Sequence, residues 1–168
     1  MKSPEKQKTA EKKRKPNPFS EIHLLAKAFK PPVILYTPDG GKTVEVARVH
    51  RYAIQPKDGE VISKLDVMFA LSKASLAKVK SGITVDPTIK AQGNRTAKKI
   101  ADRPKIKGKL MASADQKPVR CVMLTGHILR GTQRALTRYH IILEIAGEIV
   151  LVYRHGLLSY AVEAASAE

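Results

Sequence analysis

The stretch PVRCVMLTGHILRGTQRALTRYHIILEIAGEIVLVYRHGLLSY, residues 118–160, decides the fold. Apolar residues alternate with polar ones along it, which is typical of β-strands. Gly126 separates the first two predicted strands, and Gly131 marks a sharp bend or a close approach of another backbone. Residues 146–148 predict the next turn, and residues 153–156 end one strand before a last short one. Five short, bent strands in so small a unit predict a strongly curved barrel of the OB or Sm type.

These landmarks resemble the bacterial Sm-like RNA chaperone family Hfq. The matching positions are Pro118-Val119, Thr125-Gly126, Leu129-Arg130-Gly131, Arg138-Tyr139 and Tyr153-Arg154-His155. In the family these are a Pro-Val opening, an Asn-Gly turn, a Leu-x-Gly strand, an aromatic residue after a turn and a Tyr-Lys-His motif. The first-strand aromatic residue that helps the family bind purines is Val122 here, and the acidic residue of the central turn is Thr137. The uridine-binding side is therefore the better preserved.

A second copy of the pattern lies upstream. Residues 32–40 (PVILYTPDG) open like residues 118–126, and Arg51-Tyr52 parallels Arg138-Tyr139. A helix is predicted just before this copy, over residues 19–29, with Ser20 or Asn17 as its cap. The end of the copy is degenerate, because residues 67–71 (VMFAL) stand where the Tyr-Lys-His motif is expected. The first copy is interpreted as a barrel that kept its shape and lost one binding pocket.

The predicted fold is mainly β with a short N-terminal helix and two five-stranded Sm-like barrels in tandem. Four parts are expected: a disordered basic tail (1–16), a degenerate Hfq-like domain (17–72), a basic linker (73–112) and a clearer Hfq-like domain (113–165). The formal net charge is +16, and much of it lies in the tail and the linker. Such an excess favours a polyanion partner over the alternative of a merely solubilising tail and linker.

Several classes of protein are not indicated. Cys121 is the single cysteine, which rules out an intrachain disulfide. No apolar stretch is long enough for a membrane span, and the N-terminus is too charged for a signal peptide. The histidines are scattered without metal-ligand spacing, and no catalytic or phosphate-loop motif is present, so neither a metal, a cofactor nor an enzyme is expected. These features, together with the resemblance to a bacterial family, imply a bacterial cytoplasmic protein.

The resemblance also implies the site. Arg138, Tyr139, Arg154 and His155 are expected to hold single-stranded, U-rich RNA by stacking, phosphate neutralisation and base-edge contacts. Tyr153 is expected to bridge subunits, and Arg51 and Tyr52 are candidates for RNA contact in the first copy. The structural alternative is that Tyr139 and Tyr153 are core or interface aromatics and that His155 is a satisfied turn residue.

Three functions remain open at this point. The favoured one is an RNA chaperone or post-transcriptional regulator that assembles into a ring of three two-domain chains. The competing assembly has six chains that use only the C-terminal barrel. The other functions are a DNA-binding nucleoid protein that acts through its basic tail and linker, and a ribosome-associated interaction module.

Overall fold

The computed structural model of the protein describes residues 19–93, 99–106 and 116–163. The predicted basic tail (1–16) lies outside the described residues, as do residues 94–98 and 107–112 of the predicted linker. The chain is mainly β with a short helix near its N-terminus, as predicted. In the described residues, none of the helices combines the length and apolar character needed to cross a lipid bilayer.

The first half of the chain contains six strands after one short helix. Helix α1 spans Glu21–His23 and continues as a π-helical turn, η1, over Leu24–Ala28. The strands are β1 (Val33–Thr37), β2 (Gly40–Val44), β3 (Val46–Val49), β4 (Ala53–Pro56), β5 (Ile62–Ser63) and β6 (Phe69–Ser72), with the 3₁₀ turn η2 (Lys64–Asp66) between the last two. Ser20 caps the helix, because its Oγ accepts from the backbone N–H of His23 at 3.1 Å.

The second half contains five strands. They are β8 (Lys117–Met123), β9 (His127–Leu136), β10 (His140–Ile145), β11 (Glu148–Tyr153) and, after the 3₁₀ turn η6 (Arg154–Gly156), β12 (Leu157–Val162). Gly131 in β9 marks a close approach, as predicted: a Cβ at this position would lie 2.6 Å from the carbonyl oxygen of Glu144. Gly126 forms the first turn with a φ of 92°.

The interval 73–112, predicted to be a basic linker, contains regular structure over its first part. Its elements are η3 (Lys73–Ser75), α2 (Leu76–Val79), η4 (Lys80–Gly82), β7 (Ile83–Val85), α3 (Pro87–Ala91) and η5 (Ile100–Asp102). Strand β7 pairs with β9. Val79 of α2 is fully buried, and α3 is capped by the side chain of Asp86. Residues 73–91 are therefore packed onto the second half.

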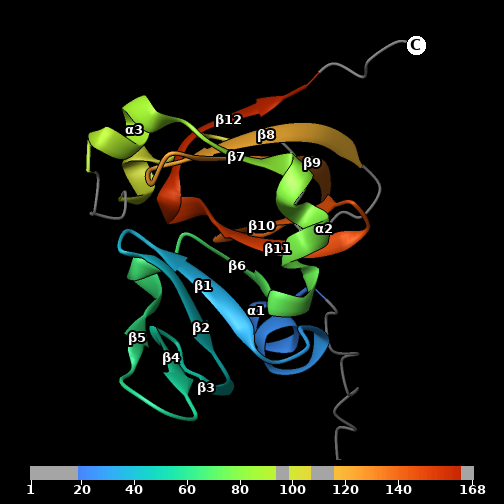
Figure 1. The fold of residues 1–168 in the computed structure, drawn as a ribbon. Helices are drawn as coiled ribbons and strands as arrows, with labels where there is room; N and C mark the ends of the chain where they lie inside the picture. Colours follow the sequence, from blue (N-terminus) through green and yellow to red (C-terminus); the bar gives the residue numbers. More distant parts are fainter. Residues whose placement is uncertain (1–18, 94–98, 107–115, 164–168) are drawn as a thin grey trace, which may run out of the picture.

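The strands do not form two separate barrels. Nine of them make one sheet in the order β12-β8-β9-β10-β11-β6-β1-β2, with β7 beside β9, and β3-β4-β5 form a second sheet. Among the described residues neither sheet closes into a barrel. The reason is that β6 pairs with β1 on one side and with β11 on the other, so the two halves share a sheet (Figure 1).

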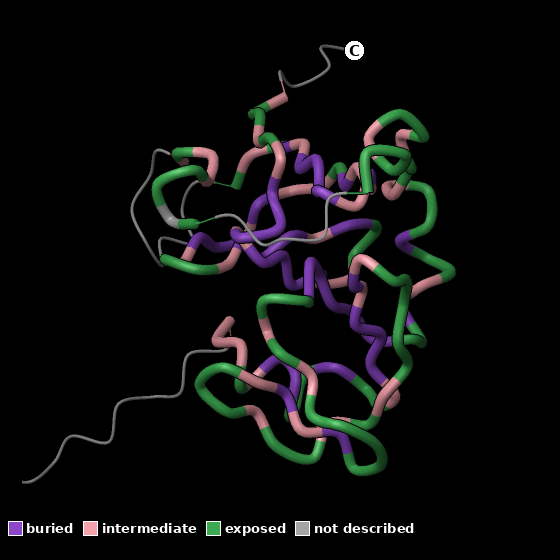
Figure 2. The backbone as a smooth tube through the Cα atoms, turned by 90° about the vertical axis from the view of Figure 1, so that its left-hand side faces the viewer, coloured by how far each residue is buried: buried purple, intermediate pink, exposed green. Residues whose placement is uncertain are grey.

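The core runs across this junction. Phe69 and Leu71 of β6 pack on one face with Val150 and Val152 of β11, while Ala70 packs on the opposite face with Leu151 and Tyr153. Strands buried on both faces are apolar throughout, which explains the uniform apolar run of residues 67–71. Figure 2 shows the buried backbone passing through the middle of the molecule into both halves.

The internal repeat extends to individual backbone hydrogen bonds. The N–H of His50 donates to the carbonyl of Ala53 at 2.8 Å, and the N–H of Thr137 donates to that of His140 at 2.9 Å. The N–H of Lys64 donates to the carbonyl of Tyr52 at 3.0 Å. In the second half the N–H of Arg154 donates to that of Tyr139 at 2.9 Å.

These bonds correct one sequence-based interpretation. The counterpart of Arg154 in the first half is Lys64 in η2, and not a residue of the run 67–71. That run instead follows the end of η2 and continues into strand β6. The first half therefore carries a basic residue at the position where its motif was expected to be lost.

Candidate nucleic-acid-binding pocket

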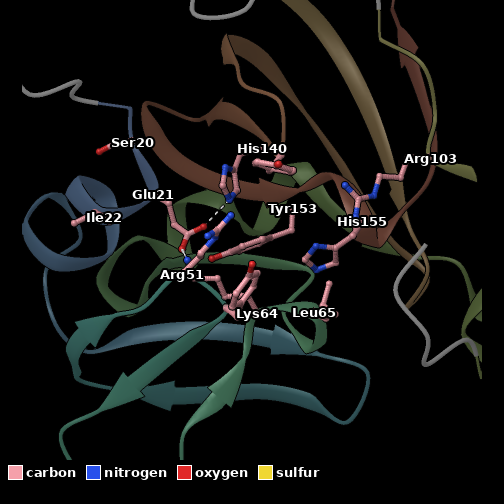
Figure 3. A pocket seen from close by; sticks show the side chains of 12 residues that line it. Ser20, Glu21, Ile22, Arg51, Lys64, Leu65, Arg103, His140, Tyr153 and His155 are labelled. Atoms are coloured by element: carbon pink, nitrogen blue, oxygen red, sulfur yellow. Dashed lines mark ion pairs between the residues drawn. The ribbon is translucent and has the colours of Figure 1, made fainter. Parts of the chain in front are cut away.

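A cavity of about 540 Å³ lies at the junction of the two halves, and we call it the junction cavity. The first half contributes the side chains of Arg51, Tyr52, Lys64 and Leu65, together with Ser20, Glu21 and Ile22 from the start of the chain's helix. The second half contributes Tyr139, His140, Tyr153 and His155, and Arg103 comes from the segment between the halves. Figure 3 shows Arg103 on the side of the cavity opposite Glu21. Predicted residues of both copies thus meet here: Arg51 and Tyr52 of the first, and Tyr139, Tyr153 and His155 of the second.

Two Arg-Tyr pairs lie beside this cavity: Arg51, Tyr52 and Tyr139 line it, and Arg138 lines a smaller adjoining cavity. The guanidinium carbon of Arg51 is 5.2 Å from the ring centroid of Tyr52, and that of Arg138 is 5.5 Å from the ring of Tyr139. Tyr52 is 72% exposed and Tyr139 is 49% exposed. Because both residues are exposed, they are not core aromatics, which was one part of the structural alternative for Tyr139; the other part was an interface aromatic. An exposed ring next to a cation suits the stacking of an unpaired base.

Tyr153 occupies the boundary between the halves within one chain. It is 2% exposed, and its backbone N–H donates to the carbonyl of Met68 at 2.9 Å. Burial raises the pKa of its hydroxyl well above the ordinary value. Among the described residues this buried hydroxyl has no hydrogen-bond partner.

His155 is held by the fold. Its Nε2–H donates to the carbonyl oxygen of Val67 at 2.8 Å, across the junction of the halves. Burial lowers the pKa of the imidazole to about 4, so the ring is neutral near pH 7. Its Nε2–H is used for Val67 and is not offered to a base. His155 thus borders the cavity as a satisfied turn residue, and its predicted role as a base-edge donor has no support in this geometry.

Arg154 is also fixed in place. Its Nη1 donates to the carbonyl oxygens of Thr137 at 3.0 Å and Arg138 at 3.2 Å, which ties η6 to the turn before Tyr139. Its side chain borders a second, smaller cavity with Arg138 and Tyr139. The four residues predicted for RNA contact therefore lie close together, but they are divided between two adjoining cavities.

Glu21 was not found from the sequence. Its carboxylate forms an ion pair with Lys64 and lies 2.6 Å from Nε2 of His140, as the dashed line in Figure 3 marks. Burial alone would raise the pKa of this carboxyl, but hydrogen bonds from His140 and Lys64 outweigh burial and lower it. Because Glu21 neutralises Lys64, the first half presents Arg51 as its cation at the cavity. In the described residues no group of three or more His, Cys, Asp and Glu side chains is placed to hold a metal ion.

Comparison with known proteins gave no relative: no family model, no curated protein and no solved structure matches the chain.

Proposed function

We propose that this chain is a single-stranded RNA-binding protein of the Sm-like type, similar to Hfq, that acts as an RNA chaperone or post-transcriptional regulator. The observation that carries the proposal is that both tyrosines of the two Arg-Tyr pairs, Tyr52 and Tyr139, line the junction cavity. Single-stranded RNA is bound by stacking of unpaired bases on flat side chains while nearby cations neutralise phosphates. Tyr52 and Tyr139 supply the rings, and Arg51 and Arg138 supply the cations.

The preference for U-rich RNA rests on the resemblance carried by Tyr153-Arg154-His155. The strand order supports the Sm-like assignment, because the fifth strand of the second half, β12, returns to pair with its first strand, β8. The first half does the same with β6 and β1. Each half is thus an open unit in which the last strand pairs with the first.

The binding test compares U-rich RNA, A-rich RNA and duplex DNA at one salt concentration by fluorescence anisotropy. Loss of one stacked base costs about 1–3 kcal/mol, so Tyr52→Ala and Tyr139→Ala are each expected to weaken U-rich binding by about 5- to 150-fold. The matched controls, Tyr52→Phe and Tyr139→Phe, keep the rings and should bind like the unaltered chain. Unchanged U-rich binding by a folded double alanine variant would contradict the proposal. Duplex binding that equals RNA binding in all variants would favour the nucleoid alternative.

We also propose that three chains assemble into a ring of six halves. Within one chain, the fourth strand of the second half (β11) pairs with the last strand of the first (β6). The strands at sheet edges include β5, which precedes the last strand of the first half as β11 does in the second, and β12, the last strand of the second half. Exposed edges favour pairing with another chain, and closed symmetry satisfies every edge. Light scattering should give the mass of three chains, and the mass of one chain at micromolar concentration would contradict this assembly.

A further inference from the structure

A second cavity, of about 270 Å³, adjoins the junction cavity, and we call it the basic cavity. Its lining residues are Arg103, Pro104, Lys105, Arg138, Tyr139 and Arg154. Arg103 and Tyr139 line both cavities. Four of the six lining residues are cations, and none of the described residues that line it is acidic.

The charges in this cavity come from separate parts of the chain. Arg138 and Arg154 belong to the second half, whereas Arg103 and Lys105 belong to the segment between the halves. That segment follows η5 and has no counterpart in the repeat, yet it reaches the cavity beside Tyr139. The fold thus adds two cations to a place where the repeat already supplies two.

Arg154 shows how the cavity is arranged. Two carbonyl oxygens hold its Nη1, which fixes the guanidinium plane, while its Nε is buried with no hydrogen-bond partner among the described residues. Burial lowers the pKa of Arg154, and the like charge of Arg103 lowers it further. Clustered like charges are stabilised when an anion enters, and guanidinium groups form strong, directional hydrogen bonds to phosphate.

We propose that the basic cavity binds a phosphate of the RNA strand whose base stacks on Tyr139. This inference rests on the proposed RNA-binding function and adds a role for the segment between the halves. Residues 103–105 complete the phosphate site that Arg138 and Arg154 also line. The position is suitable because Tyr139 borders both cavities, so a base in one and its phosphate in the other belong to one nucleotide or to neighbours.

The test removes the two added cations in the full chain. Arg103→Ala with Lys105→Ala is compared with Lys42→Ala with Lys80→Ala, which removes the same charge from exposed residues of β2 and η4. Affinity for a short oligouridylate is measured over a range of salt concentrations. Each phosphate contact contributes about 0.7 to the slope of log K against log salt for single strands. We expect the Arg103/Lys105 variant to lose about that much slope and about tenfold in affinity, with an unchanged preference for U over A because phosphate contacts carry no sequence information.

A second arm needs no RNA. Inorganic phosphate is titrated into the full chain while the arginine Nε–H resonances are followed by NMR, with exposed Arg48 as the internal reference. We expect Arg154 to shift at concentrations that leave Arg48 unchanged, and the Arg103/Lys105 variant to lose this selectivity.

The outcomes separate the two proposals. If the chain binds no RNA while phosphate shifts Arg154, the RNA function fails and the phosphate site stands. If RNA binds but phosphate moves no resonance selectively, the phosphate site is overturned and the RNA function stands. A salt slope for the Arg103/Lys105 variant equal to that of the Lys42/Lys80 variant also overturns the phosphate site.

Discussion

Replacing Phe69 with alanine tests whether the two halves unfold as one unit. Phe69 is fully buried in β6, the strand shared by both halves. Its ring stacks on Tyr36 of the first half, with centroids 4.3 Å apart and planes 10° apart, and meets the edge of His127 of the second half at 5.2 Å. Truncation of a buried phenylalanine costs about 3–5 kcal/mol, and loss of the aromatic contacts places the expected cost at the upper end.

The measurement is urea unfolding followed by circular dichroism. Domains unfold with free energies of about 5–15 kcal/mol, so the Phe69→Ala variant should unfold at much lower urea, and in a single transition because both faces of β6 join the halves. Phe69→Leu, which keeps part of the apolar volume but loses the aromatic contacts, should cost less than Phe69→Ala. Tyr52→Ala, at an exposed ring, should stay within about 0.5 kcal/mol. A loss below 1 kcal/mol for Phe69→Ala, or two transitions of which only one moves, would refute the shared-core reasoning.

Three further predictions concern single groups. Burial lowers the folded-state pKa of His155 to about 4. Between pH 6.5 and 4 the unfolded chain therefore gains a proton that the folded chain does not. The contribution of His155 to the free energy of unfolding is complete above pH 6.5 and is lost as the pH falls through this window. Urea unfolding should show a loss of up to about 3 kcal/mol over this window. The His155→Gln variant, whose side chain can still donate to Val67, should not show this pH-dependent loss. The same pH dependence in both proteins would contradict this assignment. Gly131→Ala should destabilise the fold by about 1–3 kcal/mol, since its Cβ would lie 2.6 Å from the carbonyl oxygen of Glu144, and an unchanged urea midpoint would count against that close approach. Burial raises the pKa of Cys121 to about 12, so a thiol-specific disulfide reagent at pH 8 should label it only in urea, and rapid labelling of the folded chain would show that β8 is more open than described.

Local patterns predicted the local structure well. Ser20 and the apolar spacing of residues 19–29 predicted the helix, and Gly126 and Gly131 predicted a turn and a close backbone approach. These features depend on residues near one another in the chain, which is why spacing alone reveals them. The shared sheet was not predictable in this way, because pairing of β6 with β11 joins residues far apart in sequence.

The misplaced motif has a specific cause. Gly40 and Gly126 are 86 residues apart, whereas Lys64 and Arg154, joined to equivalent partners, are 90 apart. A search at constant spacing therefore lands on Val67 instead of on η2. The signal that would have found η2 is the similarity of Lys64-Leu65-Asp66 before an apolar run to Arg154-His155-Gly156 before Leu157.

The candidate site was predicted in part. Arg138 and Tyr139 follow a strand and a turn that the sequence indicates, so their exposure at the surface was predictable. Glu21 and Arg103 reach the same place only through the packing of the helix and of the segment between the halves. The sequence suggested that His155 donates a hydrogen bond to a base. In the structure the buried ring donates to the carbonyl oxygen of Val67 instead.

The pairing of β6 with β11 inside one chain has a consequence for symmetry. In an oligomer of identical single-unit chains, every boundary between units repeats the same residues, so a change at one site is a change at all of them. Here the two walls of the junction cavity are encoded separately. His155 on one wall faces no copy of itself, because the equivalent place in the first half holds Leu65. The two halves also do not dissociate on dilution, because the covalent connection between them gives each half a high effective concentration near the other. Such a chain can therefore change one wall without changing the other, and can do so at concentrations where separate subunits would dissociate.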